Sequence, residues 1–472
     1  MTVRASRVAL LEAGLAVAVC LSRIPFLFAG YGHDPDAWRV AWTGREIVRT
    51  GMYQSSRAPG NPIPELVAAA LASTPPWTMN ALGAFFGAVA VILFGRLLRR
   101  LGCHGWFAGA VALAFTPVIA IHSTDSMDYV WALAFVLGAW LAALDRRPGL
   151  AGLLVGLATG CRITSLVMLV PLSILVVAES EGRDRRGTLA TLWGAGIAFA
   201  AVAFSPVIVR SGLTFLHGYE HGYPALLYVA KNLTVDVWGV PGCVALALAL
   251  GLILLRRGST PSGKAALPAR SGAVFFAAAL AVVLELALFF RLPHEAAYLI
   301  PAVPFTLLLL ARGLTRREFI ALCACVAVST FIVKVSEPGK LDVAPLGGLG
   351  GRMTVAGHAF EVDVLRGPLM TDHLHRKADL LYVERVRETA RRSSAPSVIV
   401  AYEWLPVLRV MAGGSREGRV TYVYSPTRRQ LDSLNALGVA VYDLPGAEGG
   451  TQAWWGYSLR AGGSRPLALS PR

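Results

Sequence analysis

The chain has 472 residues, of which 55% are hydrophobic and 15% are charged, and its formal net charge is +15. Soluble domains usually carry about 25% charged residues, so this composition excludes an ordinary soluble enzyme. The positive charge does not indicate a nucleic-acid partner, because the arginines stand in short clusters at the ends of apolar runs, without basic–aromatic interleaving.

Apolar runs recur along residues 1–335, and their lengths are typical of a polytopic helical membrane protein. In chain order the predicted spans are 8–29, 77–98, 106–122, 129–144, 149–160, 164–178, 189–209, 237–255, 273–290, 297–310 and 319–333. This is about eleven crossings. The arginine clusters between them place the N-terminus in the cytoplasm, and an odd number of crossings then places the tail outside.

A polar segment, residues 30–75, directly follows the first predicted span and forms the predicted first external loop. Its segment 62–73 is too short to cross the membrane, so we expect it to lie along the outer interface. The charged residues and imidazole of interest in this loop are His33, Asp34, Asp36, Arg39, Arg57 and Glu65.

The tail, residues 336–472, has no run long enough to cross a bilayer. Strand-like β-branched runs alternate there with amphipathic helix patterns, for example in "PSVIVAYEWLPVL". We therefore predict a transmembrane domain over 1–335 and an extracytoplasmic α/β domain over 336–472.

Ionisable residues close to a membrane are energetically costly and by default suggest a functional site. On the predicted topology, four sets of them share the outer side of the membrane. These sets are His33, Asp34, Asp36 and Arg39; His122, Asp125 and Asp128; Arg162; and Arg291, His294 and Glu295. Their convergence predicts one site at the outer ends of the spans.

Simpler roles stay open for several of these residues. Arg23 and Arg291 can extend their charged ends to the interface while their stems stay in the apolar layer. Asp34 and Asp125 can cap helices that begin near Pro35 and Met127, since aspartate accepts bonds from free backbone N–H groups. Arg162 can pair with Asp125 or Asp128 for structure alone.

Several segments resemble the GT-C class of integral membrane glycosyltransferases, of the mannosyltransferase and aminoarabinose-transferase type. They are "RIPFL" at the end of the first span, an acidic pair in the first external loop, and "GMYQSSRAPGNPIPEL". Later segments follow in the same order, namely "AFTPVIAIHSTDSMDYVWALAFVLGAWLAAL", "GLLVGLATGCRITSLVMLVPL" and "RLPHEAAYLIPAVPFTLLLL". The resemblance covers residues 8–310.

This resemblance implies a cell-envelope transferase of the cytoplasmic (inner) membrane that uses a polyprenyl-phosphate-linked sugar and works on the outer face. It also implies a catalytic acidic residue in the first external loop, usually in an Asp-Glu pair followed by an aromatic residue. Asp36 is the best match, although Ala37 stands where the class commonly has glutamate. Asp34, just upstream, is the alternative.

The chemistry of such a transfer needs one carboxylate to take a proton from the acceptor hydroxyl, and cationic donors for the departing phosphate. Candidate phosphate ligands are Arg57, Arg162, Arg291 and His294, with Glu295 holding an arginine or a sugar hydroxyl. The further substrate-binding candidates are Asp125, Asp128, Arg39 and Glu65. The sequence requires no metal but leaves a divalent cation open, and it indicates neither the sugar nor the acceptor.

Two other functions compete with this prediction: a polytopic transporter, and a non-catalytic protein that binds polyprenyl phosphate. A transporter commonly has charged residues near the middle of the membrane and broken helices in two related halves. In this chain the charges stand on one side, and no internal repeat is visible.

Overall fold

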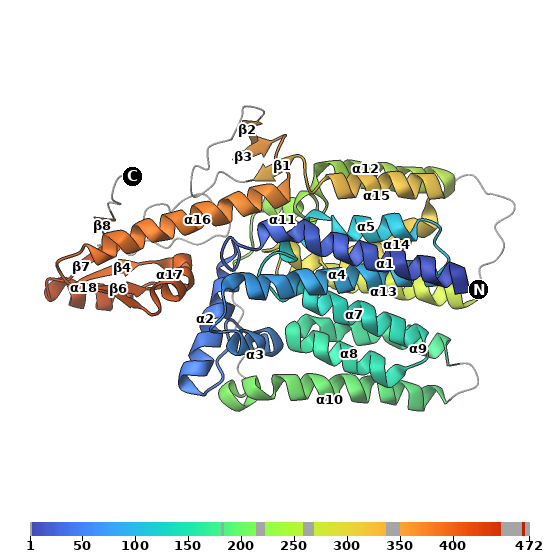
Figure 1. Cartoon of the computed structure of the whole chain (residues 1–472), viewed down its shortest axis with the longest axis horizontal. Helices are drawn as coiled ribbons and strands as arrows, with labels where there is room; N and C mark the ends of the chain where they lie inside the picture. Colours follow the sequence, from blue (N-terminus) through green and yellow to red (C-terminus); the bar gives the residue numbers. More distant parts are fainter. Residues whose placement is uncertain are drawn as a thin grey trace.

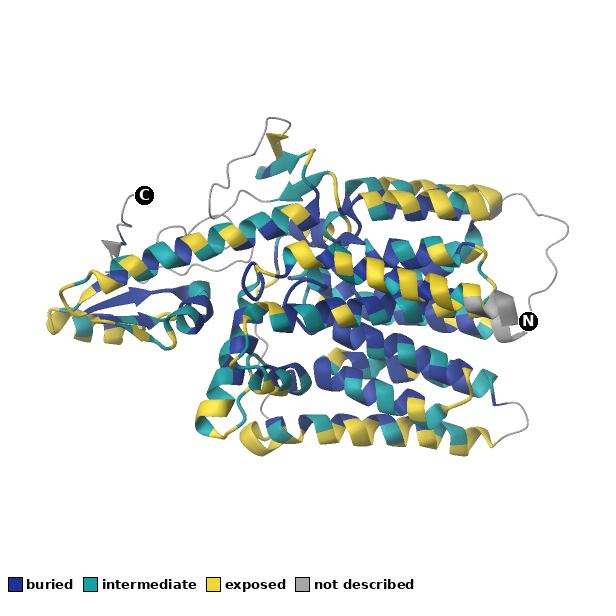
Figure 2. Ribbon diagram, viewed as in Figure 1, coloured by how far each residue is buried: buried dark blue, intermediate teal, exposed yellow. Residues whose placement is uncertain are grey.

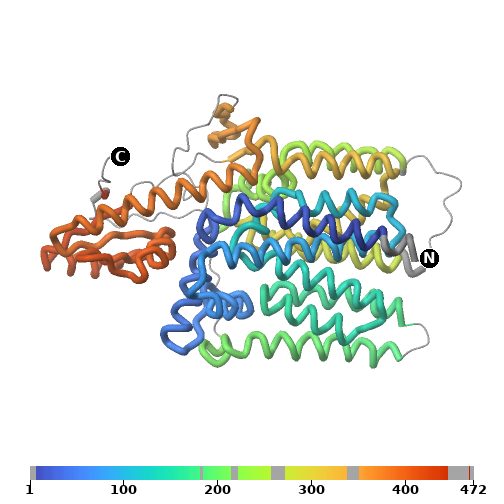
Figure 3. Tube along the Cα trace, in the orientation of Figure 1, coloured from blue at the N-terminus to red at the C-terminus, as the bar shows by residue number. Residues whose placement is uncertain are grey.

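The computed structural model describes residues 2–180, 184–213, 222–257, 269–336, 350–444 and 465–467. Helices α1 to α15 form a bundle in which most helices run along the long axis of the molecule (Figure 1). The C-terminal sheet lies beyond one end of this bundle, and the N-terminal end of α1 lies at the other end (Figure 3). Helix α16 connects the bundle to the sheet.

The helices of the bundle have the following bounds. They are α1 (Thr2–Arg23), α2 (Pro35–Thr50), α3 (Pro62–Ala70), α4 (Pro76–Arg100), α5 (Trp106–Ala114), α6 (Pro117–His122), α7 (Tyr129–Leu144), α8 (Pro148–Cys161), α9 (Leu169–Ala178), α10 (Arg185–Ser211), α11 (Leu226–Leu233), α12 (Val235–Arg257), α13 (Ala269–Arg291), α14 (Ala302–Gly313) and α15 (Arg316–Val328). Short 3-10 helices include η1 (Ile24–Phe26), η2 (Ile163–Met168) and η4 (Ala296–Leu299).

The protein is an integral membrane protein. Within the described ranges, 5 helices are long and apolar enough to cross a membrane, and the described part also holds shorter apolar helices. The long ones are Arg7–Phe26, Pro76–Arg100, Arg185–Ser211, Val235–Arg256 and Gly272–Arg291, and the shorter ones are Tyr129–Leu144, Pro148–Cys161, Ile163–Ala178 and Ala302–Gly313. Every predicted span falls on a helix or a pair of helices, whereas the total of about eleven crossings stays a prediction.

The outer helices expose apolar surface, as lipid contact requires. Large apolar side chains such as Val202 and Val209 on α10, and Leu248 and Leu255 on α12, are exposed. Figure 2 shows exposed residues along these helices, while the centre of the bundle is buried. An apolar surface of this extent on a monomer is suited to contact with lipid chains.

The predicted span 106–122 is wrong as a single helix. Helix α5 ends at Ala114 and α6 begins at Pro117, with Thr116 in an extended conformation (φ −70°, ψ 128°). A residue before proline disfavours the helical conformation, while proline itself suits the first position of the next helix. After this break, α6 runs only to His122 and ends next to the loop 123–128.

The side chain of Arg23 lies at this break between α5 and α6. The prediction that its charged end extends to the membrane interface is therefore wrong. The Arg23 side chain is fully buried. The guanidinium donates to Ser123 Oγ at 2.7 Å and to the carbonyl of Ala114. Arg23 therefore fixes the end of α1 against the loop that follows α6.

The tail has α/β structure, as predicted. Strands β1 (Lys334–Ser336), β2 (Gly350–Val355) and β3 (His358–Asp363) form an antiparallel sheet of order β1-β3-β2, followed by helix α16 (Pro368–Arg391). The second sheet has the order β5-β6-β4-β7-β8. Its strands are β4 (Ser397–Val400), β5 (Arg416–Glu417), β6 (Val420–Val423), β7 (Ala440–Asp443) and β8 (Arg465–Pro466), and its helices are α17 (Leu405–Ala412) and α18 (Arg428–Ala436).

The tail is attached to the bundle by buried polar contacts. Arg376 of α16 has a side chain that is 1% exposed, and it donates to the carbonyl of Thr124 at 2.7 Å and to its Oγ1 at 3.1 Å. Asp372 holds the same guanidinium at 2.6 Å. Arg45 of α2 donates to the carbonyl of Val410 on α17 at 2.6 Å. These contacts hold α16 and α17 over the first loop.

Candidate functional site

A cavity of about 390 Å³ lies between the bundle and the tail. Its bundle wall comes from the start of α2, the end of α6, α11 and the segment before η4. Its opposite wall comes from α16 and from the turn between β4 and α17. Ligand sites are usually concave and mostly apolar with a few convergent polar groups, and this cavity has that character.

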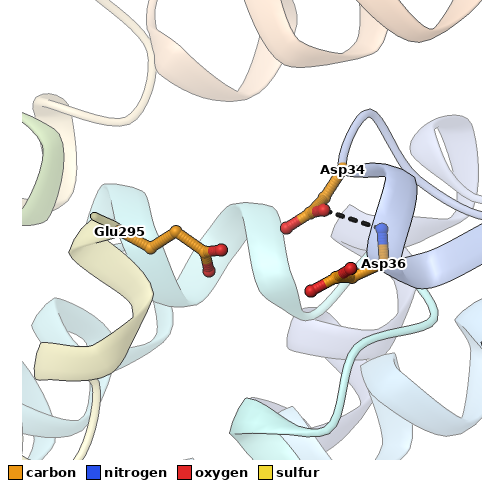
Figure 4. A group of neighbouring side chains, drawn as sticks. All are labelled: Asp34, Asp36 and Glu295. Atoms are coloured by element: carbon orange, nitrogen blue, oxygen red, sulfur yellow. Dashed lines mark hydrogen bonds between the residues drawn. The ribbon is translucent and has the colours of Figure 1, made fainter. Parts of the chain in front are cut away.

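Three carboxylates meet beside this cavity: Asp34 and Glu295, which line it, and Asp36, which is not among the described lining residues (Figure 4). Asp34 caps α2, because its Oδ1 accepts the backbone N–H of Asp36 at 2.8 Å. The simpler role of Asp34 as a helix cap is thus confirmed, and capping also turns its carboxyl toward its neighbours. Glu295 comes from the distant segment before η4 and accepts a bond from the Tyr129 hydroxyl.

Burial, then the negative charges of Glu295 and Asp36, raise the pKa of Asp34 well above its usual value. Burial and the charge of Asp36 likewise raise the pKa of Glu295. One ligand atom of each of the three residues lies within 4.8 Å of the others, a spacing that could hold a metal ion. A proton or a divalent cation with oxygen ligands would offset their repulsion.

A chain of alternating charges runs from the tail through Asp36 into the bundle. Arg39 joins Glu403 to Asp36, with Nη1 2.6 Å from Asp36 Oδ1. Arg57 joins Asp36, at 3.3 Å, to Asp128, at 2.6 Å. Arg162 adds the last contact, 3.0 Å from Asp128. We call the residues Glu403, Arg39, Asp36, Arg57, Asp128 and Arg162 the charge chain.

The bundle end of the charge chain is buried and stacked on aromatic rings. The guanidinium of Arg162 lies 4.1 Å from the ring centre of Tyr129 and 5.1 Å from that of Tyr298. The side chain of Asp128 is 1% exposed. Burial alone would raise the pKa of Asp128, but the guanidinium groups of Arg162 and Arg57 lower it below its usual value. The contact between Arg162 and Asp128 matches the simpler structural role.

Of the other predicted site residues, some line the cavity and some do not. Asp125 and His294 line it. Asp125 Oδ1 accepts the Met127 N–H at 3.3 Å, but α7 begins only at Tyr129 with Asp128 before it, so the predicted capping role of Asp125 is wrong and its bond stabilises the loop 123–128 instead. Glu65 instead accepts bonds from Ser56 and stabilises the loop before Arg57. Arg291 is exposed and is not among the described residues that line the cavity.

The sequence prediction missed the wall that the tail contributes. This wall carries Asp372, His375 and Asp379 from α16, and Glu403 and Trp404 from the β4–α17 turn. Residues 372, 375 and 379 are three and four positions apart and so share one helix face. That spacing is visible in the sequence, but nothing local indicates that the face lies over the first loop.

The sequence prediction also missed Lys231, Lys334 and His375, whereas it included His33. Lys231 and Lys334 both contact Asp236, at 2.5 and 2.9 Å, and all three line the cavity. His33 Nδ1 lies 2.6 Å from Asp379 Oδ2 and connects the first loop to α16. Burial, then the charge of His33, lower the pKa of His375 to about 4. His375 therefore stays neutral at physiological pH.

No family model and no curated protein matches the chain. Among solved structures, the chain is similar to ArnT from Cupriavidus metallidurans in the apo state. The two sequences are 12% identical, the match covers 92% of this chain and 89% of ArnT, and the TM-score is 0.46. A likeness of this degree assigns no activity.

Proposed function

We propose that the protein is a membrane glycosyltransferase of the GT-C type, which moves a sugar from a polyprenyl-phosphate donor to an acceptor hydroxyl. The observation that carries this proposal is the meeting of Asp34, Asp36 and Glu295 at the edge of the cavity, which Asp34 and Glu295 line, beside a chain of guanidinium groups. The resemblance of the sequence to GT-C enzymes implied a catalytic acid in this loop. A transferase needs this pairing of a carboxylate with cationic donors.

The transfer forms one bond and breaks another. The acceptor oxygen bonds to the anomeric carbon of the sugar while its proton passes to Asp36. The bond between the anomeric carbon and the phosphate oxygen breaks, and the polyprenyl phosphate leaves with the electron pair. The phosphate is already a good leaving group, so one base suffices and no general acid is required.

Asp36 and Asp34 differ in their surroundings, and the difference separates their proposed roles. Asp36 contacts two guanidinium groups, from Arg39 and Arg57, which fix its carboxylate in one orientation. Asp34 has a raised pKa, which also suits a base, because a catalytic pKa near the working pH favours proton transfer. We propose Asp36 as the base and Asp34 as the alternative.

Arg57 is the best-placed ligand for the departing phosphate. It contacts the proposed base directly, and its buried Nη1 has no hydrogen-bond partner among the described residues. A buried guanidinium nitrogen without a partner is costly, and an anionic phosphate oxygen would satisfy it. His294, which lines the cavity, is a second candidate. Arg162 is connected to Asp36 only through Asp128 and Arg57, and Arg291 is not among the described lining residues.

We further propose that the protein lies in the cytoplasmic membrane with its cavity and tail outside. The arginine clusters support this orientation. Reporter fusions after Arg147, Arg257 and Ser336 should report inside, inside and outside. A cytoplasmic reporter signal after Ser336 would place the cavity on the wrong side for an externally presented donor.

The main test is to incubate membranes containing the protein with a panel of polyprenyl-phosphate sugars and to measure consumption of each. We expect one donor to be consumed, with Asp36→Asn lowering the rate by about 10²–10⁴ because the amide cannot accept the proton. Asp145→Asn, in an exposed pair at the opposite end of the bundle, is the matched control and should keep full activity.

Three outcomes would change this proposal. Full activity in Asp36→Asn with loss in Asp34→Asn would exchange the roles of the two residues. Donor binding without turnover in the wild type would favour a non-catalytic binding protein. Proton-coupled flux of a solute in proteoliposomes, without donor consumption, would favour a transporter.

A further inference from the structure

The tail wall of the cavity is a single polar helix face. Thr371, Asp372, His375, Ala378 and Asp379 of α16 all line the cavity. Their spacing places them on one side of the helix over about two turns. Arg376 holds α16 in place by its bonds to Thr124, so this face is rigidly positioned over the bundle.

The same wall continues into a turn whose backbone is strained. Tyr402 has φ +44°, an uncommon conformation for a residue other than glycine. Such strain often marks a functional segment. The turn directs Glu403 and Trp404 to the cavity, and Trp404 is only partly buried.

The position of this turn in the sheet is typical of a ligand site. Strand β4 is central, with parallel strands β6 and β7 on its two sides. The chain leaves β4 toward β6 and later crosses to β7, so the strand order reverses at β4. Ligands of open parallel sheets bind outside the carboxyl ends of the strands at such a reversal. Glu403 and Trp404 follow the carboxyl end of β4.

The two substrates of the proposed reaction must approach from different sides. The polyprenyl chain of the donor stays in the membrane, so its phosphate is presented along the bundle wall. The tail wall comes from the part of α16 that lies over the end of the bundle and from the turn before α17, and Figure 1 shows α17 and the second sheet beyond this end, away from the lipid-facing helices. The acceptor is therefore the substrate that this wall would meet.

The chemistry of the tail wall is suited to hydroxyl groups. Each carboxylate of Asp372, Asp379 and Glu403 can accept about four hydrogen bonds, and one neighbouring cation fixes each of them. The ring of Trp404 offers a flat apolar surface with a polar edge, on which the C–H face of a sugar can lie. In the described contacts, each cation beside this wall is already paired with one of these carboxylates, so the wall offers no unpaired positive charge to attract a phosphate or carboxylate ligand.

We infer that the tail wall is the acceptor subsite, and that it selects a neutral, polyhydroxylated acceptor such as an uncharged glycan over a phosphorylated one. This inference rests on the proposed glycosyltransferase function and adds the class of its second substrate. It assigns Asp379 and Trp404 to acceptor specificity and leaves the bond-forming chemistry to the bundle wall.

The test uses the full-length protein in detergent with its polyprenyl-phosphate sugar, and a panel of neutral glycans beside the same glycans carrying a phosphate. Two quantities are measured: sugar transferred to the glycan, and sugar released to water. We expect transfer to neutral members of the panel. In Trp404→Leu and Asp379→Asn, the ratio of transfer to release should fall by about tenfold or more, through a raised KM for the glycan.

Glu388→Gln is the matched control, because Glu388 is an exposed acidic residue of the same helix and pairs only with Arg392 in the described contacts. It should leave the ratio and both KM values unchanged. Transfer mainly to phosphorylated glycans would overturn the inference, as would unchanged glycan KM values in both variants. Release to water without transfer to any member of the panel would also overturn it, whereas no donor consumption at all would count against the proposed function instead.

Discussion

Arginine–carboxylate pairs occur at both ends of the helix bundle, and their surroundings differ sharply. In the pair Arg100–Asp145, at the end opposite the tail, the two side chains are 43% and 46% exposed. In the pair Arg57–Asp128 of the charge chain, they are 14% and 1% exposed. The same chemical groups are therefore in water at one end and enclosed by protein at the other.

This difference indicates which pairs are there for function. An exposed pair contributes about 0–1 kcal/mol and mainly helps solubility and orientation in the membrane. A buried pair costs desolvation energy that its attraction barely offsets, and an apolar replacement is often as stable. The two pairs that buried Asp128 makes with Arg57 and Arg162 are thus poor evidence for a stability role and good evidence for a site.

The largest effect should come from removing the carboxylate that two arginines share. Asp128→Asn leaves the guanidinium group of Arg162 without its carboxylate partner and Arg57 with Asp36 alone, and breaking a buried pair in this way typically costs about 3–5 kcal/mol. We expect a clear fall in thermal stability and loss of turnover. Differential scanning fluorimetry in detergent and the donor assay would measure both. Wild-type stability in this variant would contradict the view that burial distinguishes the charge chain from the exposed pairs at the other end of the bundle.

Arg162 should respond in a graded manner. Arg162→Lys keeps the positive charge but loses the planar fork and much of the stacking on Tyr129 and Tyr298. Arg162→Ala loses all three contributions. If Arg162 serves the donor, donor affinity should fall in the order wild type, lysine, alanine, with little change in stability. A fall in stability at constant donor affinity would assign Arg162 to structure alone.

The next effect is a shift in pH dependence. The negative charge of Glu295 helps to raise the pKa of Asp34, so Glu295→Gln removes part of this repulsion and lowers that pKa. The carboxylate form then persists to lower pH. With Asp34, the alternative base, as the titrating group, the acid limb of the pH–kcat/KM profile should move toward lower pH relative to wild type. An acid limb that stays in place would exclude Asp34 as the group that titrates in catalysis.

The smallest effect on stability and turnover should come from a substitution at the end of the helix bundle opposite the tail. Glu318 pairs with Arg256 at 2.5 Å, and the two side chains are 26% and 46% exposed. Glu318→Gln should change neither the melting temperature nor turnover beyond measurement error, because solvent screens an exposed pair. A melting temperature lowered as far as in Asp128→Asn would remove the distinction between the two ends.

The sequence predicted the helical bundle and half of the cavity because the responsible signals are local. Length and hydropathy of apolar runs mark spans directly, and Asp34 before Pro35 is a helix start that is visible in two residues. The convergence of Asp34, His122, Asp125 and Glu295 on one cavity also follows from their shared position at span ends.

The rest of the site depends on contacts that no local pattern contains. His33 and Asp379 are 346 positions apart in the sequence, yet their side chains touch. The tail was predicted correctly as α/β, but its docking over the first loop depends on Arg376, whose partner Thr124 belongs to an unremarkable loop. The helix break before Pro117 was a local signal that hydropathy concealed, because both halves are apolar.

The charge chain has a further consequence for the catalytic cycle. It contains three carboxylates and three guanidinium groups, so it is electrically balanced at rest. In the proposed reaction, a proton that arrives on Asp36 leaves Arg39 and Arg57 with one uncompensated positive charge at the moment when the departing phosphate gains a negative one. The product phosphate is thus retained electrostatically until Asp36 loses its proton, which couples product release to proton loss into the cavity water.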